Sequence, residues 1–183
     1  MTRFPVLLAF ASPAWAAPAC AEVVAATPAG MTSTNRAAVT AEPGDVWAAL
    51  TQPDLYWSAD HSWSGNSENM TIDPRVGGCF CEALPAAPGG WVEHARVIYY
   101  EPDRQLRLSG AFGPLQSEAL TGTLTVTLTQ VEGGSATEIE WTYVVGGYAR
   151  FDLVQLAPVV DGVMSEQLGR LAKLLDPIDA PEE

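Results

Sequence analysis

The sequence is poor in positive charge. Only 9 of its 183 residues are Lys or Arg, against 22 that are Asp or Glu, and the net charge at pH 7 is -13. The few basic residues form no cluster, and an acidic surface repels phosphate groups. Binding to nucleic acid and adsorption to anionic membranes are therefore not expected.

Long hydrophobic runs are also missing. No stretch approaches the roughly 20 apolar residues that cross a bilayer, so the sequence predicts no integral membrane segment. The apolar fraction of 48% and the charged fraction of 17% are nevertheless typical of a globular chain rather than a disordered one. At this length the chain can form one domain with a full core.

Cysteine and histidine are scarce, with three and two residues respectively. Cys79 and Cys81 lie in a predicted strand, where α-carbons two residues apart are roughly 7 Å apart, which disfavours a bridge between them. If a disulfide forms, Cys20 is the better partner for either of them. Together with His61 and His94 these two cysteines could supply four zinc ligands. Their spacing matches no recognised motif, so we predict neither a metal nor a cofactor.

The N-terminus has the features of a secretory signal. Arg3 precedes a short apolar run, and residues 14–16 (Ala-Trp-Ala) form a small-x-small triplet suited to signal peptidase. We expect residues 1–16 to be a signal peptide and the protein to be periplasmic or secreted; without a signal it would be cytoplasmic. Residues 17–34 are rich in Ala, Pro and Thr and predict a flexible segment, and residues 177–183 predict an acidic tail.

The pattern of a single domain covers residues 35–176. A first strand is predicted at residues 35–41, and Pro43 and the acids around it then begin a short helix, with a second short helix within residues 54–64. Apolar and polar residues alternate through residues 70–145, as in an antiparallel sheet with one face in water. We expect six to seven strands in total.

The C-terminal part predicts one long amphipathic helix at residues 153–175, in which apolar residues recur every three or four positions. Pro158 and Gly162 disfavour helix, so the helix is expected to begin at Ala157 or to bend there. The predicted fold is α+β, with a curved sheet wrapped around this helix, because no other element is large enough to cover the apolar face. Space left between sheet and helix is a common place for a ligand.

Three segments carry a resemblance to a known group of proteins. They are Ala-Glu-Pro-Gly-Asp-Val-Trp at residues 41–47, Asp-Pro-Arg-Val-Gly-Gly-Cys-Phe at residues 73–80 and Gln-Leu-Gly-Arg-Leu at residues 167–171. Over residues 35–175 the chain resembles the helix-grip superfamily, also called START-like or SRPBCC, which includes polyketide cyclases, lipid-transfer domains and homologues of the heat-shock ATPase activator. The resemblance implies a helix gripped by a sheet and the binding of a small hydrophobic molecule. A minority of the group catalyse cyclisation, hydrolysis or condensation.

Aromatic side chains are the candidates to line such a cavity, since they combine apolar area with a polar group and suit a ring-shaped ligand. Taken one at a time, each is more typical of an ordinary core. The residues predicted to contact a ligand are Trp57, Trp63, Phe80, Phe112, Trp141 and Tyr143. Arg96 is placed on the same face as His94 and could bind a ligand carboxylate, unless it is simply exposed.

Glu82 and His94 lie on strands that we expect to be neighbours. If both face inward, the carboxylate could orient the imidazole and raise its pKa, giving an acid–base pair. The preferred function is the binding of a small hydrophobic or aromatic molecule without a cofactor. One alternative is a cyclase or hydrolase that uses Glu82 and His94, with Tyr143 as a third group. The other is a protein-interaction module like the ATPase activators, which export from the cytosol would exclude.

Overall fold

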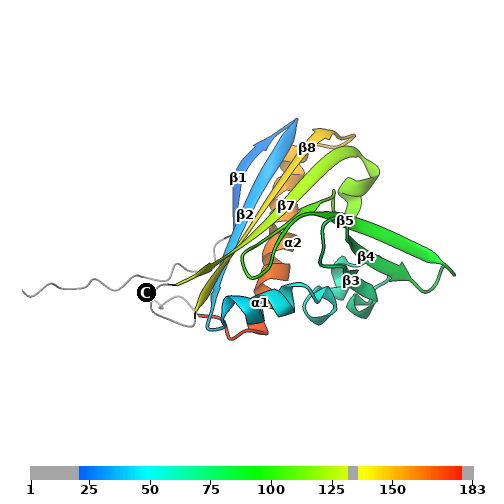
Figure 1. The fold of residues 1–183 in the computed structure, drawn as a ribbon. Coiled ribbons are helices and arrows are strands. Elements are labelled where there is room, and N and C mark those ends of the chain that lie inside the picture. The colour runs from blue at the N-terminus through cyan, green and yellow to red at the C-terminus, as the bar shows by residue number, and fades with distance from the viewer. Residues whose placement is uncertain (1–20, 132–135, 179–183) are drawn as a thin grey trace, which may run out of the picture.

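The computed structural model describes residues 21–131 and 136–178, and the predicted signal peptide lies outside them. Within this part of the chain, eight antiparallel strands form one curved sheet, with a long helix on its concave side (Figure 1). The predicted α+β helix-grip fold is confirmed. None of the helices in the described ranges is both long and apolar enough to cross a membrane.

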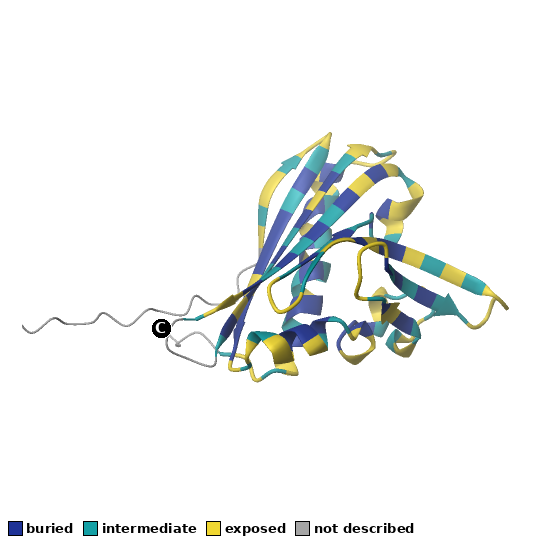
Figure 2. Ribbon diagram, viewed as in Figure 1, coloured by how far each residue is buried: buried dark blue, intermediate teal, exposed yellow. Residues whose placement is uncertain are grey.

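The sheet follows the chain closely. Its strands are β1 (Ala21–Thr27), β2 (Gly30–Val39), β3 (Met70–Ile72), β4 (Cys79–Leu84), β5 (Gly90–Glu101), β6 (Gln105–Ser109), β7 (Ala119–Gln130) and β8 (Thr137–Tyr148). Their order in the sheet is β1-β2-β8-β7-β6-β5-β4-β3, so only the β2–β8 pairing joins strands distant in sequence. Buried and exposed residues alternate along the strands, most regularly along β7 and β8 (Figure 2). This alternation gives the sheet one face toward the core.

The described residues also contain two α-helices and four short 3-10 helices. They are α1 (Pro43–Leu50), α2 (Leu153–Lys173), η1 (Pro53–Leu55), η2 (Ala59–His61), η3 (Ser67–Asn69) and η4 (Gly113–Ser117). The second short helix predicted within residues 54–64 is therefore wrong, since η1 and η2 take its place. The segment contains three serines, which favour turns and caps, and is shorter than the length at which helices propagate well.

The prediction that residues 17–34 form a flexible segment is wrong for residues 21–34, which belong to β1 and β2. The two strands form a hairpin whose loop is Pro28-Ala29, with Thr27 paired to Gly30. Gly30 permits the close approach of β8, because a Cβ there would lie 2.5 Å from the Val145 carbonyl oxygen. The small residues of β1 gave no alternation by which a strand could be identified.

Helix α2 begins at Leu153, where the predicted apolar stripe begins, and not at the alternative start, Ala157. Asp152 caps it by accepting a hydrogen bond of 2.9 Å from the Val154 N–H. Pro158 then falls near the N-terminus, where its ring is exposed and its missing N–H costs only one helical hydrogen bond. The turn before Pro158 therefore belongs to the helix, and its Leu156 borders the candidate site.

Helix α2 packs against the β1–β2 side of the sheet rather than along its middle. Ala157, Met164 and Leu168 are buried there. Asp161 accepts hydrogen bonds of 2.6 Å from the Ser33 hydroxyl and 3.3 Å from the Asn35 amide. These polar contacts fix the helix on β2. The adjoining side of α2 is left facing the remainder of the concave surface.

Replacing Asp152 with Ala is expected to lower the free energy of unfolding by about 1 kcal/mol, the usual cost of losing an N-cap. Chemical denaturation of the purified protein measures this directly. Asp152→Asn is the matched control, because the amide oxygen can still accept the Val154 N–H and should preserve most of the stability. Equal losses in the two variants would contradict a capping role.

Candidate functional site

A cavity of about 350 Å³ lies beside α2. One wall is the N-terminal half of the helix, a second is the segment that includes η2, and a third is the start of η4. His94 and Tyr143 border the cavity from the sheet. Its apolar lining includes Trp57, Trp63, Phe112, Leu156, Val160 and Val163. The helix therefore lies over the sheet without filling the space beneath it.

Four of the predicted contact residues line this cavity: Trp57, Trp63, Phe112 and Tyr143. Phe80 and Trp141 are fully buried but do not border it. Phe80 instead supports the lining, with its ring centroid 5.2 Å from that of Trp57 and 5.1 Å from that of His94. Such edge and tilted contacts hold aromatic rings in fixed orientations.

The Tyr143 hydroxyl is engaged by the backbone. It accepts a hydrogen bond of 2.9 Å from the Phe112 N–H and donates one of 3.1 Å to the Gly110 carbonyl. Gly122 makes room for it, because a Cβ there would lie 2.7 Å from the hydroxyl oxygen. Burial raises the pKa of Tyr143 well above its ordinary value. The hydroxyl thus positions the loop before η4 and is not free to transfer a proton.

A β-bulge turns His94 toward the cavity. Phe80 on β4 pairs with Ala95 on β5, but the next residue, Cys81, pairs with Glu93, which leaves His94 as an extra residue. The inserted residue breaks the alternation, so that His94 and Ala95 are both buried. Bulges often redirect a side chain next to a functional site.

Glu82 holds the imidazole from behind. The carboxylate is fully buried, and its Oε2 lies 2.9 Å from His94 Nε2. The same carboxylate accepts hydrogen bonds from the backbone N–H groups of Trp63 and Ser64. It therefore joins β4, the His94 bulge and the cavity wall after η2. The predicted proximity of Glu82 and His94 is confirmed, although only His94 borders the cavity.

The pKa of His94 is lowered, contrary to the expectation that Glu82 raises it. Burial lowers the pKa of His94 below its ordinary value and outweighs the opposing effect of Glu82. Burial alone would raise the pKa of Glu82, but hydrogen bonds from Ser64, Trp63 and His94 together lower it. At neutral pH the carboxylate is ionised and the imidazole is neutral.

This charge state determines the tautomer of His94. An ionised carboxylate only accepts hydrogen bonds, so Nε2 must carry the proton that Glu82 receives. In the neutral ring Nδ1 then keeps its lone pair, and the described residues provide no hydrogen bond to it. On the sheet side of the cavity, His94 therefore presents an acceptor that is able to bind a donor or to take up a proton.

The lowered pKa predicts how stability depends on pH. Just below pH 6.5 the unfolded chain protonates His94 while the folded protein does not. The free energy of unfolding should therefore fall as the pH is lowered from about 6.5 toward the folded pKa. Denaturation at about pH 7.5 and about pH 5.5 measures this fall. It should be smaller in His94→Gln, and an equal fall in both proteins would contradict the assignment.

Two predicted groups of side chains do not come together. Arg96 does not share a face with His94, because the bulge reverses the alternation; it is exposed and bonded to Glu93 and the Gly77 carbonyl. Nor do the four residues considered for zinc converge. His61 lies 3.0 Å from Glu166 at the cavity rim, and the cysteines alternate with buried Phe80 and Glu82 on the other face of β4.

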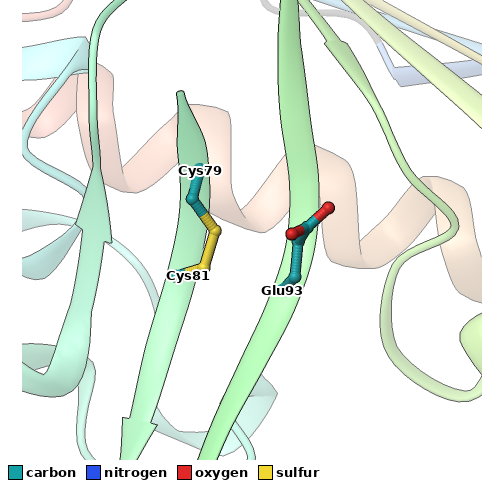
Figure 3. A group of neighbouring side chains, drawn as sticks. All are labelled: Cys79, Cys81 and Glu93. Atoms are coloured by element: carbon teal, nitrogen blue, oxygen red, sulfur yellow. A yellow bond between two sulfur atoms is a disulfide. The ribbon is translucent and has the colours of Figure 1, made fainter. Parts of the chain in front are cut away.

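The two cysteines form a disulfide with each other, which corrects the expectation that Cys20 would be the partner (Figure 3). Their α-carbons are 5.3 Å apart, closer than in a fully extended strand and within the range that a disulfide spans. The contraction of β4 lies beside the bulge in β5, where the pairing of the two strands is already irregular.

Sequence reasoning missed the contribution of α2 to the lining. Leu156, Val159, Val160, Val163 and Met164 all border the cavity. Several of them were visible as part of the apolar stripe, but the stripe alone did not show which residues pack on the sheet and which face the cavity. That division depends on the sideways position of the helix.

The wall around η2 is fastened to α2 by polar contacts. Gln167 accepts a hydrogen bond of 2.7 Å from the Ser58 N–H, and Arg170 donates one of 2.6 Å to the Tyr56 carbonyl. Gln167 is fully buried, so its loss would leave a polar group without a partner. The cavity wall is thus held from both the helix and, through Glu82, the sheet.

The curved sheet and the long helix on its concave side define a helix-grip protein. The model of the family "Polyketide cyclase / dehydrase and lipid transport" matches residues 31–176, and the chain belongs to this family. The resemblance to the SRPBCC superfamily is thereby confirmed. A comparison with curated proteins gives no match.

Solved structures of similar fold come from several bacteria. The Mll3558 protein of Rhizobium loti is 21% identical, with a TM-score of 0.56 over 79% of this chain and 96% of that one. The Aha1 dimer of Colwellia psychrerythraea is 16% identical, with a TM-score of 0.53 and the same coverage. CalU16 of Micromonospora echinospora is 19% identical, with a TM-score of 0.51 over 83% and 78%. At these identities the likeness shows the fold alone.

Proposed function

We propose that the protein binds a small hydrophobic or aromatic molecule in the cavity beside α2. The observation that carries the proposal is a space of about 350 Å³ with mostly apolar walls and with the His94 imidazole at its border on the sheet. Sites for small molecules commonly measure about 300–1,000 Å³ and combine apolar walls with a few polar groups. This volume is at the lower end of that range and favours a ligand of one or two rings over a lipid with two acyl chains.

The tautomer of His94 specifies the polar part of this ligand. Because Nε2–H is held by Glu82, the ring offers Nδ1 as an acceptor. A hydroxyl or N–H group on the ligand would satisfy it, whereas a carboxylate would meet an ionised Glu82 nearby with no described positive charge lining the cavity. We infer that the preferred ligand is an uncharged ring compound that carries a hydrogen-bond donor.

A matched pair of probes tests this proposal. Isothermal titration with 2-naphthol and naphthalene should show binding of both, with 2-naphthol tighter by about tenfold, equivalent to one hydrogen bond. In His94→Phe the preference should disappear. Native mass spectrometry of the purified protein should also detect a small molecule that is lost on denaturation. If neither probe binds and no molecule copurifies, the proposal is wrong.

The second candidate is an enzyme of the cyclase or hydrolase type, and the Glu82–His94 pair favours it. A neutral imidazole oriented by a carboxylate is suited to accept a proton from a bound substrate. Tyr143 takes no part in this version, since its hydroxyl is occupied by the backbone. Incubating the copurified molecule with fresh protein separates the two candidates. Recovery of the same mass supports binding alone, and a new product absent with His94→Gln supports catalysis.

Export remains part of the proposal and rests on the sequence of residues 1–16. We infer that the mature protein acts outside the cytoplasm, where a cytosolic chaperone would not be its partner. When the protein is produced in a Gram-negative host, it should be found in the periplasmic fraction. N-terminal sequencing should show that the mature chain begins at Ala17. A protein that stays in the cytoplasm with Met1 intact would contradict export. The protein-interaction alternative would then no longer be excluded.

A further inference from the structure

A second cluster of reactive groups lies on the other face of the sheet from the cavity. Cys79 and Cys81 on β4 face Glu93 on β5, and Figure 3 shows the disulfide next to the carboxylate. The two sulfur atoms and a Glu93 oxygen all lie within 4.8 Å of one another. Glu93 is exposed and both cysteines are partly accessible, so solvent species can reach the cluster.

The backbone holds this cluster together independently of the disulfide. Cys81 and Glu93 are directly paired across β4 and β5, and Cys79 is paired with Arg96. Side chains opposite each other on neighbouring strands are about 4.5–5.5 Å apart at Cβ. The bulge at His94 places Glu93 and Arg96, three residues apart, beside the two cysteines. Breaking the sulfur–sulfur bond would therefore leave two thiols and a carboxylate in one place.

We propose that reduction of the Cys79–Cys81 disulfide converts this cluster into a binding site for a thiophilic divalent cation of the Zn²⁺ type. The disulfide takes two electrons and two protons from an external dithiol, which becomes a disulfide in turn. The two protein thiols then release their protons as Zn²⁺ binds to the thiolates. Oxidation reverses the sequence and expels the cation, so the site is occupied only in the reduced protein.

The charges of the cluster favour a divalent cation. In the reduced, metal-bound state Cys79, Cys81 and Glu93 bring three negative charges, and Arg96 brings one positive charge. Arg96 already bonds both carboxylate oxygens of Glu93 and the Gly77 carbonyl. A cation with charge +2 makes the total zero. Without it, two thiolates beside a carboxylate would repel one another.

The ligand set also suits the coordination of zinc. Bonds of about 2.3 Å to sulfur and about 2.0–2.2 Å to a carboxylate oxygen place tetrahedral ligands about 3.5–4 Å apart. The present separations of up to 4.8 Å require only side-chain adjustment. Arg96 would orient the ligating carboxylate from behind, as outer-shell groups commonly do. The fourth position faces solvent and would be open to water.

The test compares one protein in two redox states. Cys20 is first replaced with Ser so that Cys79 and Cys81 are the only cysteines in the sequence. The protein reduced with a phosphine and desalted without oxygen is titrated with Co²⁺, whose thiolate charge-transfer absorption reports sulfur ligands, and then with Zn²⁺ in competition. We expect one Co²⁺ per reduced chain, displaced by Zn²⁺, and none for the oxidised chain. Thiolate absorption absent from the reduced protein would overturn the proposal.

Two further variants separate the ligands from nonspecific binding to an acidic protein. Glu93→Gln should weaken Zn²⁺ binding by about tenfold or more, on the scale by which metal-site substitutions act. Glu138→Gln removes an exposed carboxylate from β8 and should leave binding unchanged. Equal affinity in Glu93→Gln and the parent would overturn the assignment of Glu93. Circular dichroism of each reduced variant confirms that the chain remains folded.

Discussion

Replacing Glu82 with Ala is expected to lower the free energy of unfolding by about 3–5 kcal/mol, because it removes three hydrogen bonds to a buried charged acceptor, each worth about 1.5–3 kcal/mol. The fully buried carboxylate accepts hydrogen bonds from Trp63, Ser64 and His94. Its removal leaves three donors without their acceptor in a partly buried region. Chemical denaturation at neutral pH measures the loss.

Two further variants show whether this cost depends on the buried network. Glu138→Ala removes an exposed strand carboxylate and should change stability by less than about 0.5 kcal/mol. Glu82→Gln retains the shape and one acceptor oxygen, so it should cost less than Glu82→Ala. A loss below about 1 kcal/mol in Glu82→Ala would show that water replaces the carboxylate, and the cavity wall would not depend on Glu82.

Replacing Phe80 with Ala is also expected to cost about 3–5 kcal/mol, as for other buried aromatic residues. The ring is 1% exposed and lies against Trp57, His94 and Phe112. Truncation would leave a void beneath the cavity lining. Because Phe80 supports the lining without bordering the cavity, the variant should also weaken 2-naphthol binding by loosening Trp57 and His94.

Phe151→Ala is the matched control for this substitution. The Phe151 side chain is 37% exposed and borders neither the cavity nor the aromatic cluster, so its loss should cost about 1 kcal/mol or less. Denaturation and titration with 2-naphthol on both variants distinguish the two positions. Similar stabilities for Phe80→Ala and Phe151→Ala would contradict the proposed packing.

Much of the fold could be predicted from local patterns. The strict alternation in residues 120–131 and 137–145 identified β7 and β8, and the apolar stripe identified α2. The N-terminal strand β1 could not be predicted, because its Ala-rich sequence has no period and it is held by pairing to β2 and packing of α2. Such a strand is specified by its tertiary surroundings rather than by its own residues.

The candidate site was predictable only in part. Glu82 and His94 were correctly placed on neighbouring strands. The bulge that turns His94 inward could not be predicted, because the alternating pattern of the sequence does not mark an inserted residue. The same bulge places Arg96 outside and moves Glu93 toward the cysteines. One inserted residue thus accounts for both the correct and the incorrect assignments on β5. The direction of the His94 pKa shift depends on burial, which the sequence alone does not give.

If α2 leaves a ligand-sized space over the sheet, a large side chain placed in that space should block ligand binding. Val160, on α2, borders the cavity. Val154 lies on the same helix, is 42% exposed and does not border the cavity. Tryptophan fluorescence and calorimetric titration with 2-naphthol should show binding abolished in Val160→Trp and unchanged in Val154→Trp. Undiminished binding by a folded Val160→Trp protein would show that the ligand is not bound in the cavity beside α2.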